Sequence, residues 1–207
     1  MYARSTTVQG NPGKLDEAIA YVGEKEFPAI TAIPGCIGLS MLADRENGRV
    51  IVSSAWADED AVKASKETVR PMQDRLMQML GADDALIQSW DIAVLHREKP
   101  SPDGARAQVT WSRIAPDHID TLLNAYRGSM LSRLQTLPGF TSLSLVVDRK
   151  QGRIVSVTSF DSAATCEQAR KPARGFREEF AQAVSARITD VAEMDVAVAH
   201  LHVPDNA

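Results

Sequence analysis

The sequence predicts an α+β fold built from two copies of one unit, and three observations support this prediction. The chain has 207 residues, of which 44% are apolar and 24% charged, as is typical of globular proteins. Its second half repeats the first at an offset of 104 residues without a gap. Each copy shows periodic patterns in the order strand, helix, strand, strand, helix, strand.

The repeat is clearest where Ala32 to Trp56 aligns with Thr136 to Phe160. About 18 of ~96 aligned positions are identical, where composition alone would give roughly 6. We therefore expect a first unit over residues 1–97 and a second over 105–203. Residues 98–104 carry prolines, a glycine and charges, which are typical of a linker.

Within the first copy, the apolar pattern predicts each element in turn. A first strand is expected before Pro12, which is placed to open a helix that ends at a Pro-Gly pair. Two strands and a polar turn ending in Gly then indicate a hairpin. In the first copy the predicted strands are 2–9, 37–43, 50–56 and 88–96, and the predicted first helix is 12–31. In the second copy, the first and last strands are predicted at 106–113 and 192–200.

The hairpin turn itself repeats, with Asp44, Arg45 and Gly48 recurring 104 residues later. Turn chemistry explains the Asp and the Gly without any functional role. After the hairpin, Asp58 and Ser162 are placed as N-caps of a second helix.

The second helix contains Pro71 in the first copy and Pro172 in the second. Because an internal proline removes a hydrogen bond, we expect each helix to break near Arg70 and Arg174. These breaks would lie at the mouth of a pocket between the helices and the sheet.

The order of elements is the ferredoxin-like βαββαβ arrangement, in which both helices lie on one face of the sheet. The strands are apolar on both faces, which predicts that both faces are buried. We therefore expect two antiparallel sheets face to face in one chain, with the helices outside, forming an intrachain α/β barrel.

These segments resemble a known family. The stretch 33–40, the turn residues Asp44 and Arg45, and the strand that ends in Trp56 before an acidic cap are similar to the antibiotic biosynthesis monooxygenase (ABM) family of dimeric α/β barrels. The resemblance implies a tandem fusion in which one polypeptide makes the pseudo-dimer, with further homo-oligomers left open. Haem-degrading relatives carry an Asn on the first strand and a His on the second helix. This chain has neither, so we expect no haem and no other cofactor.

Composition and charge exclude several classes of partner. The net charge is −4 and no basic run occurs, which argues against nucleic acid. No apolar run reaches the length of a membrane span, and no signal peptide is visible, so a cytoplasmic protein is expected. Cys36 and Cys166 are expected as reduced, packed thiols, and no metal site is expected.

Two pairs of repeated polar residues are candidate catalytic groups. His96 and His200 end the last strands and can act as bases on a phenol or enol, or can be hydrated strand ends. Arg70 and Arg174 can hold a phenolate, carboxylate or oxyanion, or can form surface pairs with the acid four residues on.

Aromatic residues are candidates for lining a substrate pocket, although each also suits core packing. One pocket per unit is expected, and the two need not be equivalent because their aromatic residues differ. The candidates are Trp56, Trp90, Trp111, Tyr126, Phe176 and Phe180.

Two functions are the main candidates, and a third interpretation, a purely structural interaction protein, predicts that the pockets of both units are filled. The first is a cofactor-independent monooxygenase acting on a small aromatic or polyketide-like substrate, whose anion reacts with O2. The second is a non-catalytic barrel that binds a small apolar ligand or serves in a stress response. Few titratable residues lie on the expected pocket-facing stripes, which favours the second.

Overall fold

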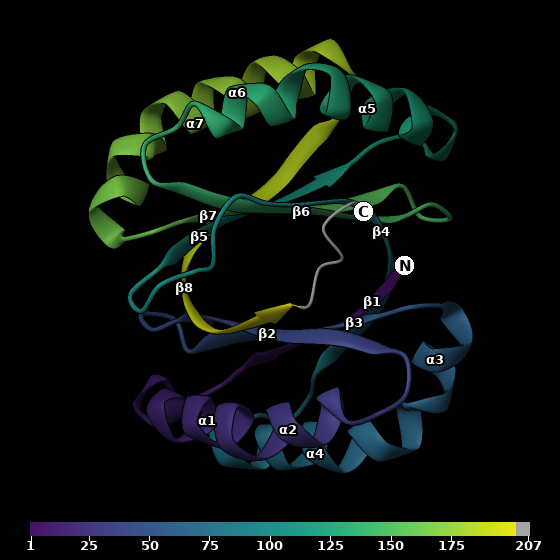
Figure 1. The fold of residues 1–207 in the computed structure, drawn as a ribbon, viewed down its shortest axis with the longest axis vertical. Helices are drawn as coiled ribbons and strands as arrows, with labels where there is room; N and C mark the ends of the chain where they lie inside the picture. The colour runs from purple at the N-terminus through teal and green to yellow at the C-terminus, as the bar shows by residue number, and fades with distance from the viewer. Residues whose placement is uncertain (202–207) are drawn as a thin grey trace. The chain divides into compact units, whose positions relative to one another are not determined.

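The computed structural model describes the backbone of residues 1–201 and the side chains of residues 1–199. The eight strands follow the hydrogen-bonded order β1-β3-β2-β8-β5-β7-β6-β4 and form a closed barrel. The pairs β1–β3, β2–β8, β4–β6 and β5–β7 are antiparallel, so the predicted α+β fold of two ferredoxin-like units in an antiparallel barrel is confirmed. Figure 1 shows the elements.

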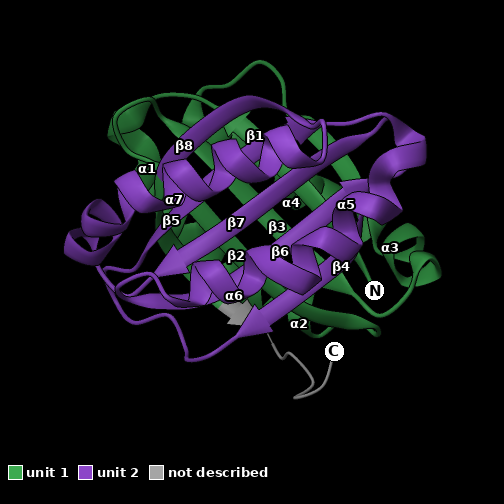
Figure 2. Ribbon diagram, turned by 90° about the horizontal axis from the view of Figure 1, so that it is seen from above, with its two compact units in different colours: residues 1–90, 194–206 green, residues 91–193, 207 purple. Residues whose placement is uncertain are grey.

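The chain divides into two compact units (Figure 2). The last strand of each sequence repeat begins in one unit and ends in the other. Among the described residues, unit 1 comprises 1–90 and 194–201, and unit 2 comprises 91–193. Both β4 (Leu86–Arg97) and β8 (Arg187–Leu201) therefore pass from one unit into the other. These packing units and the sequence repeats divide the chain at different points.

The other elements of the first half all belong to unit 1. They are β1 (Tyr2–Gln9), η1 (Pro12–Lys14), α1 (Leu15–Tyr21), η2 (Val22–Glu26), α2 (Phe27–Thr31), β2 (Cys36–Asp44), β3 (Arg49–Trp56), α3 (Glu59–Ala64) and α4 (Lys66–Leu80). The predicted strands are confirmed to within one or two residues at their ends.

The second half repeats this series in unit 2. Its elements are β5 (Arg106–Arg113), η3 (Pro116–His118), α5 (Ile119–Ala125), η4 (Tyr126–Met130), α6 (Leu131–Gln135), β6 (Phe140–Asp148), β7 (Arg153–Phe160) and α7 (Ala163–Ala183). β8 begins five residues earlier than the sequence predicts.

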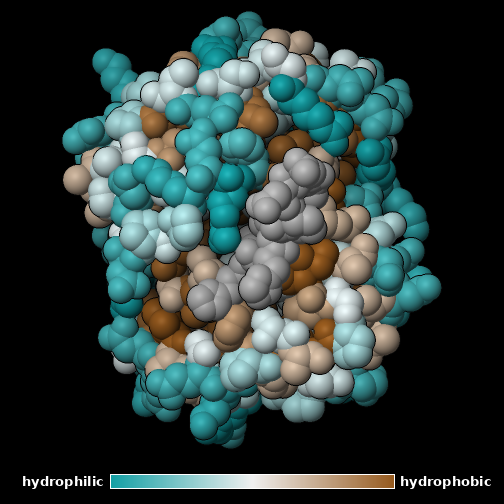
Figure 3. Space-filling model, in the orientation of Figure 1, coloured by the Kyte–Doolittle hydropathy of each residue, from teal (hydrophilic) through white to brown (hydrophobic). Residues whose placement is uncertain are grey.

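In each unit the helices cover one face of the sheet, with α1, α2 and α4 on β1–β3 and α5–α7 on β5–β7 (Figure 1). The outer surfaces of these helices are mostly hydrophilic, as Figure 3 shows. Their inner faces pack on a core in each unit, where Trp56 and Phe160 occupy equivalent, fully buried positions. Burial of this apolar surface is the main stabilising contribution.

The repeated hairpin turn has a structural explanation. Asp44 accepts hydrogen bonds from the backbone N–H groups of Glu46 (3.2 Å) and Asn47 (3.1 Å). Gly48 has φ +70°, and a Cβ there would lie 2.1 Å from the Gly10 carbonyl oxygen. Only glycine fits this position, so the prediction of turn chemistry is confirmed.

The turn arginine clamps three segments of its own unit. Arg45 lies 2.6 Å from Asp16 on α1 and 2.7 Å from Asp195 on β8. In unit 2, Arg149 makes the same contacts with Asp120 (2.8 Å) and Asp91 (3.6 Å). Asp195 and Asp91 lie within β8 and β4, and this shared contact explains why the two acids recur in both repeats.

The predicted breaks near Arg70 and Arg174 are wrong. Helix α7 runs without interruption through Pro172, and the break of the first copy lies at Ser65, between α3 and α4. Pro71 and Pro172 are exposed, so water can hydrate the carbonyl groups that lose their donors. The N-caps Asp58 and Ser162 are confirmed, the latter within a capping box.

Candidate functional site

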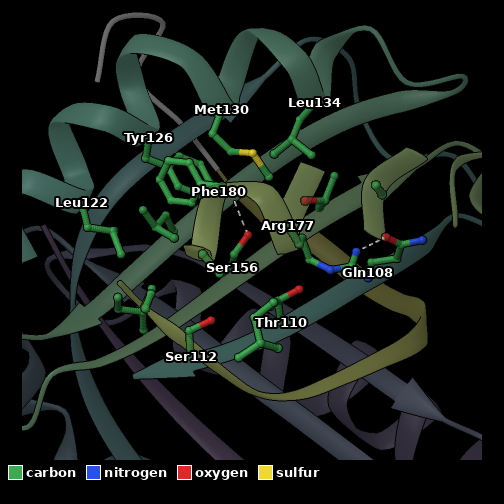
Figure 4. A pocket seen from close by; sticks show the side chains of 17 residues that line it. Gln108, Thr110, Ser112, Leu122, Tyr126, Met130, Leu134, Ser156, Arg177 and Phe180 are labelled. Atoms are coloured by element: carbon green, nitrogen blue, oxygen red, sulfur yellow. Dashed lines mark hydrogen bonds between the residues drawn. The ribbon is translucent and has the colours of Figure 1, made fainter. Parts of the chain in front are cut away.

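A cavity lies in unit 2 between the sheet and the helices that cover it (Figure 4). Its empty volume, counted together with open solvent at the mouth, is about 580 Å³. The sheet contributes polar side chains, namely Gln108, Thr110, Ser112, Ser156 and Thr158. The helices contribute mainly apolar and aromatic ones, including Leu122, Tyr126, Met130, Leu134 and Phe180.

Strand alternation explains the polar wall. Thr110 and Ser112 are two residues apart on β5, so their side chains point to the same face. Trp111 between them points to the opposite face and does not line the cavity. On the helical side, a π-helical segment, η4, places Tyr126 at one end and Met130 at the other, and both line the cavity. Such segments are frequent at functional sites.

Arg177 on α7 is the cationic group of this cavity. It is half-buried and donates a hydrogen bond from Nη1 to Gln108 Oε1 at 2.8 Å. Burial lowers the pKa of its guanidinium, but arginine stays charged at neutral pH. Among the described residues this is its only hydrogen bond, so further N–H donors remain available for an anion.

A chain of polar contacts fixes Gln108 and hence Arg177. The amide of Gln108 donates to Glu193 Oε1 at 3.3 Å, and Glu193 accepts two hydrogen bonds from Arg170, at 2.9 and 2.7 Å. The contact with Arg170 holds the pKa of Glu193 below its ordinary value. Because Gln108 is only 2% exposed, this geometry is well defined.

Tyr126 supplies a neutral hydroxyl to the cavity. Its oxygen lies 3.0 Å from Ser156 Oγ, and its ring packs edge-on against Phe180 with centroids 5.3 Å apart. Burial raises the pKa of Tyr126 to about 12, against a smaller opposite effect of Ser156. At neutral pH this phenol donates or accepts a hydrogen bond but does not act as a base.

The equivalent cavity of unit 1 is smaller, about 310 Å³ on the same measure. Arg4 occupies the position of Gln108, and Gln73 occupies that of Arg177. Arg4 donates to Ser65 Oγ at 3.0 Å and to the Val62 carbonyl, so its guanidinium is engaged with the helix break. The prediction of two non-equivalent pockets agrees with these differences.

The candidate catalytic residues from the sequence lie outside these cavities where they are described. Arg70 is exposed, and the Arg174 side chain is 72% exposed and lies 2.7 Å from Glu178. His96 Nε2 lies 3.1 Å from the Gln135 amide nitrogen, and its ring stacks on Phe140. His200 pairs with Leu39 through its backbone in β8, and its side chain is outside the described residues. Their catalytic roles stay predictions.

Of the six aromatic candidates, Tyr126 and Phe180 line the unit 2 cavity. The indoles of Trp56 and Trp90 are buried and donate to Ser54 (2.9 Å) and Ser5 (2.8 Å).

Phe176 lies beneath the Arg133 guanidinium, 4.3 Å from its ring centroid. Sequence reasoning missed Arg177, because the apolar stripe of α7 places Phe176 and Phe180 inward and leaves Arg177 between them. The available signal was its four-residue spacing from the buried Ala173.

No helix among the described residues has the length and apolarity needed to cross a membrane. Within the same part of the chain, no three His, Cys, Asp or Glu side chains gather as a metal site. The expectation of no cofactor stays a prediction.

Comparison with known proteins places this fold among related chains. The family model described as "Antibiotic biosynthesis monooxygenase" matches residues 1–70. The uncharacterized protein Rv2558 of Mycobacterium tuberculosis (strain ATCC 25618 / H37Rv) is 42% identical over 206 residues, which cover 99% of this chain and 87% of the relative.

Two solved structures share the fold at low identity. One, described as a candidate monooxygenase from Lactobacillus acidophilus, has a TM-score of 0.69 at 9% identity and covers 97% of this chain and 96% of its own. The other, an anthrone oxidase-like protein, has a TM-score of 0.65 at 13% identity and covers 96% and 91%.

Proposed function

The chain belongs to the antibiotic biosynthesis monooxygenase family, and we propose that it is a cofactor-independent monooxygenase whose reaction takes place in the unit 2 cavity. The substrate class is a small aromatic molecule with an acidic phenol, enol or anthrone group. The observation that carries this proposal is the half-buried Arg177, which faces an apolar and aromatic cavity with donors to spare.

The chemistry requires an electron-rich substrate anion. A guanidinium in a partly desolvated cavity stabilises a phenolate or enolate far more than water does, which lowers the pKa of the bound substrate. The aromatic body of the substrate would pack against Tyr126 and Phe180, while Ser156 and Thr158 hold its polar edge.

The oxidation balances without an added reductant. The carbanion of a CH2 group transfers electrons to O2 and forms a carbon-bound peroxide. Loss of water then leaves a carbonyl group, so that R2CH2 + O2 gives R2CO + H2O. The substrate supplies all four electrons, and the protein binds and orients the anion.

The decisive experiment is oxygen uptake with a panel of anthrones and hydroquinones. Replacement of Arg177 by Gln removes the charge and should lower kcat/KM by about 100-fold, the effect typical of a lost oxyanion donor. Arg113→Gln, an exposed site on the same unit, is the matched control and should change it less than twofold. Equal turnover of wild type and Arg177→Gln would refute the assignment.

The pH dependence separates anion stabilisation from base catalysis. No carboxylate or imidazole is among the 17 described residues that line the unit 2 cavity. The apparent pKa of kcat/KM should therefore shift with the pKa of the free substrate across the panel. A constant apparent pKa near that of histidine would instead point to His96 or His200.

The roles predicted for Arg70, Arg174, His96 and His200 remain proposals with their own test. A variant with all four replaced by Ala is compared with Arg177→Gln in the same assay. A larger loss in the fourfold variant would favour these roles.

The absence of a base among the lining residues favours a second candidate function, a non-catalytic protein that binds a small aromatic ligand. Such a protein would be stabilised against heat by the same anthrones and hydroquinones without consuming oxygen. Combined measurement of melting temperature and oxygen uptake on one ligand panel distinguishes the two functions.

A further inference from the structure

A buried carboxyl group lies in the unit 1 cavity without a partner. Glu26 is 3% exposed and lines this cavity together with Arg4 and apolar side chains such as Ile30 and Leu39. Its Oε1 atom has no hydrogen-bond partner among the described residues. Buried polar atoms are nearly always hydrogen-bonded, so an unpartnered carboxyl oxygen on a residue that lines a cavity indicates a missing partner.

The fold does not require a carboxyl group at this position. The equivalent residue at the end of the π-helical segment in unit 2 is Met130, which packs in the core. An apolar residue of similar length would avoid the cost of burying a carboxyl group. The cost is visible in the pKa of Glu26, which burial raises to about 7.

The charged and titratable groups around Glu26 leave its oxygen free. Arg4, on β1, directs its guanidinium to Ser65 Oγ and the Val62 carbonyl. The pKa of Tyr21, on α1, is raised by burial and, to a smaller extent, by the nearby Glu26. On α4, the amide of Gln73 donates to Thr6 Oγ1 at 2.7 Å.

From this arrangement we propose that the unit 1 cavity is a second ligand site, which binds a small neutral molecule with an apolar body and one hydroxyl group donated to Glu26 Oε1. Charge selects the class: Arg4 in the wall disfavours a cation, and Glu26 disfavours an anion. The smaller volume and the aliphatic wall select a compact body. This proposal does not depend on the function proposed for unit 2.

The test uses the full-length protein and two probes of nearly equal shape, phenol and toluene. Methyl signals of Ile30 and Leu39 report on the unit 1 cavity, and those of Leu134 and Leu145 report on unit 2. Phenol should shift the Ile30 and Leu39 signals, with an affinity there about tenfold higher than that of toluene, as expected for one hydrogen bond to a buried acceptor.

Two variants show whether Glu26 is the acceptor. Glu26→Met places the unit 2 residue at this position and should make phenol and toluene bind unit 1 equally. Glu26→Gln keeps an acceptor oxygen and should retain part of the preference, so the test stands if one variant fails to fold.

The following results would overturn the proposal. They are an absence of Ile30 and Leu39 shifts at millimolar phenol, equal affinities of wild type for the two probes, and a phenol preference that survives in Glu26→Met. Phenol shifts confined to Leu134 and Leu145 would leave the unit 2 cavity as the ligand site and would also overturn it.

Discussion

At the scale of single residues, one arginine and one glutamine occupy opposite positions in the two cavities. In unit 1 the guanidinium comes from the strand (Arg4) and the amide from the helix (Gln73), and unit 2 has Gln108 and Arg177 instead. Arg4 is occupied by the helix backbone, whereas Arg177 is held by one hydrogen bond. The same pair of residue types therefore gives a structural contact in unit 1 and the proposed anion site in unit 2.

Glu26 makes stability depend on pH. Its pKa rises from an ordinary 4.5 to about 7 on folding, so the native state binds this proton more tightly than the unfolded state. The contribution of protonated Glu26 to the free energy of unfolding is therefore complete below pH 4.5 and is lost as pH rises toward 7. The loss is on the order of 3 kcal/mol.

The measurement is the free energy of unfolding by urea at several pH values, for wild type and Glu26→Met. The difference between the two should change by this amount between pH 4.5 and pH 7.5, with the variant favoured at the higher pH. A difference that stays constant with pH would show that Glu26 ionises as readily in the folded protein as in the unfolded chain.

At the scale of elements, the second helix is broken in unit 1 and continuous in unit 2, and two residues near the break differ between the units. Unit 1 has Ser65 at the break, and its Oγ donates to the Val62 carbonyl at 2.8 Å while accepting from Arg4. Unit 2 has Ala169 at this position and Gln108 in place of Arg4, and α7 runs straight through. Arg4 and Ser65 therefore act together, as a cap for a carbonyl that the break releases.

A double-mutant cycle on Arg4 and Ser65 tests this coupling. Ser65→Ala alone should cost 1 to 2 kcal/mol, roughly the penalty for an unpaired buried donor. In the background of Arg4→Gln, as in unit 2, the same change should cost about 1 kcal/mol less. Urea midpoints of the four proteins give the coupling energy, and additive effects would show that the two residues stabilise unit 1 independently.

The elements were predictable from the sequence where local chemistry determines them. The hairpin turn, the Asp58 and Ser162 caps and the strands follow from glycine, capping and apolar periodicity. The position of the helix break could not be predicted from the sequence. Exposed prolines destabilise the helix little, and the buried contact of Ser65 with Arg4 joins residues that are 61 positions apart. Sequence analysis did not identify Arg177 for a similar reason, since the role proposed for it depends on Gln108, 69 positions away.

At the scale of the whole molecule, each packing unit is completed by a strand from the other sequence repeat. Residues 195–201 of β8 pair with β2 in unit 1, and residues 91–97 of β4 pair with β6 in unit 2. The arginine clamps, Arg45 with Asp195 and Arg149 with Asp91, join the two repeats at the same places. These pairs are half-exposed, so the backbone ladders contribute most to this association.

Cutting the chain in its linker tests this exchange. A protease site inserted between Asp103 and Gly104, in an exposed turn, allows the folded protein to be cleaved without loss of a strand. Because each fragment supplies a strand to the other's sheet, both should elute together under native conditions and separate in urea. The isolated fragment 1–103 keeps the pairing of β2 with β3 but leaves the other edge of β2 without β8, so it should self-associate, which light scattering would detect. Nicked halves that separate in native buffer, or a folded monomeric fragment, would show that each repeat is complete by itself.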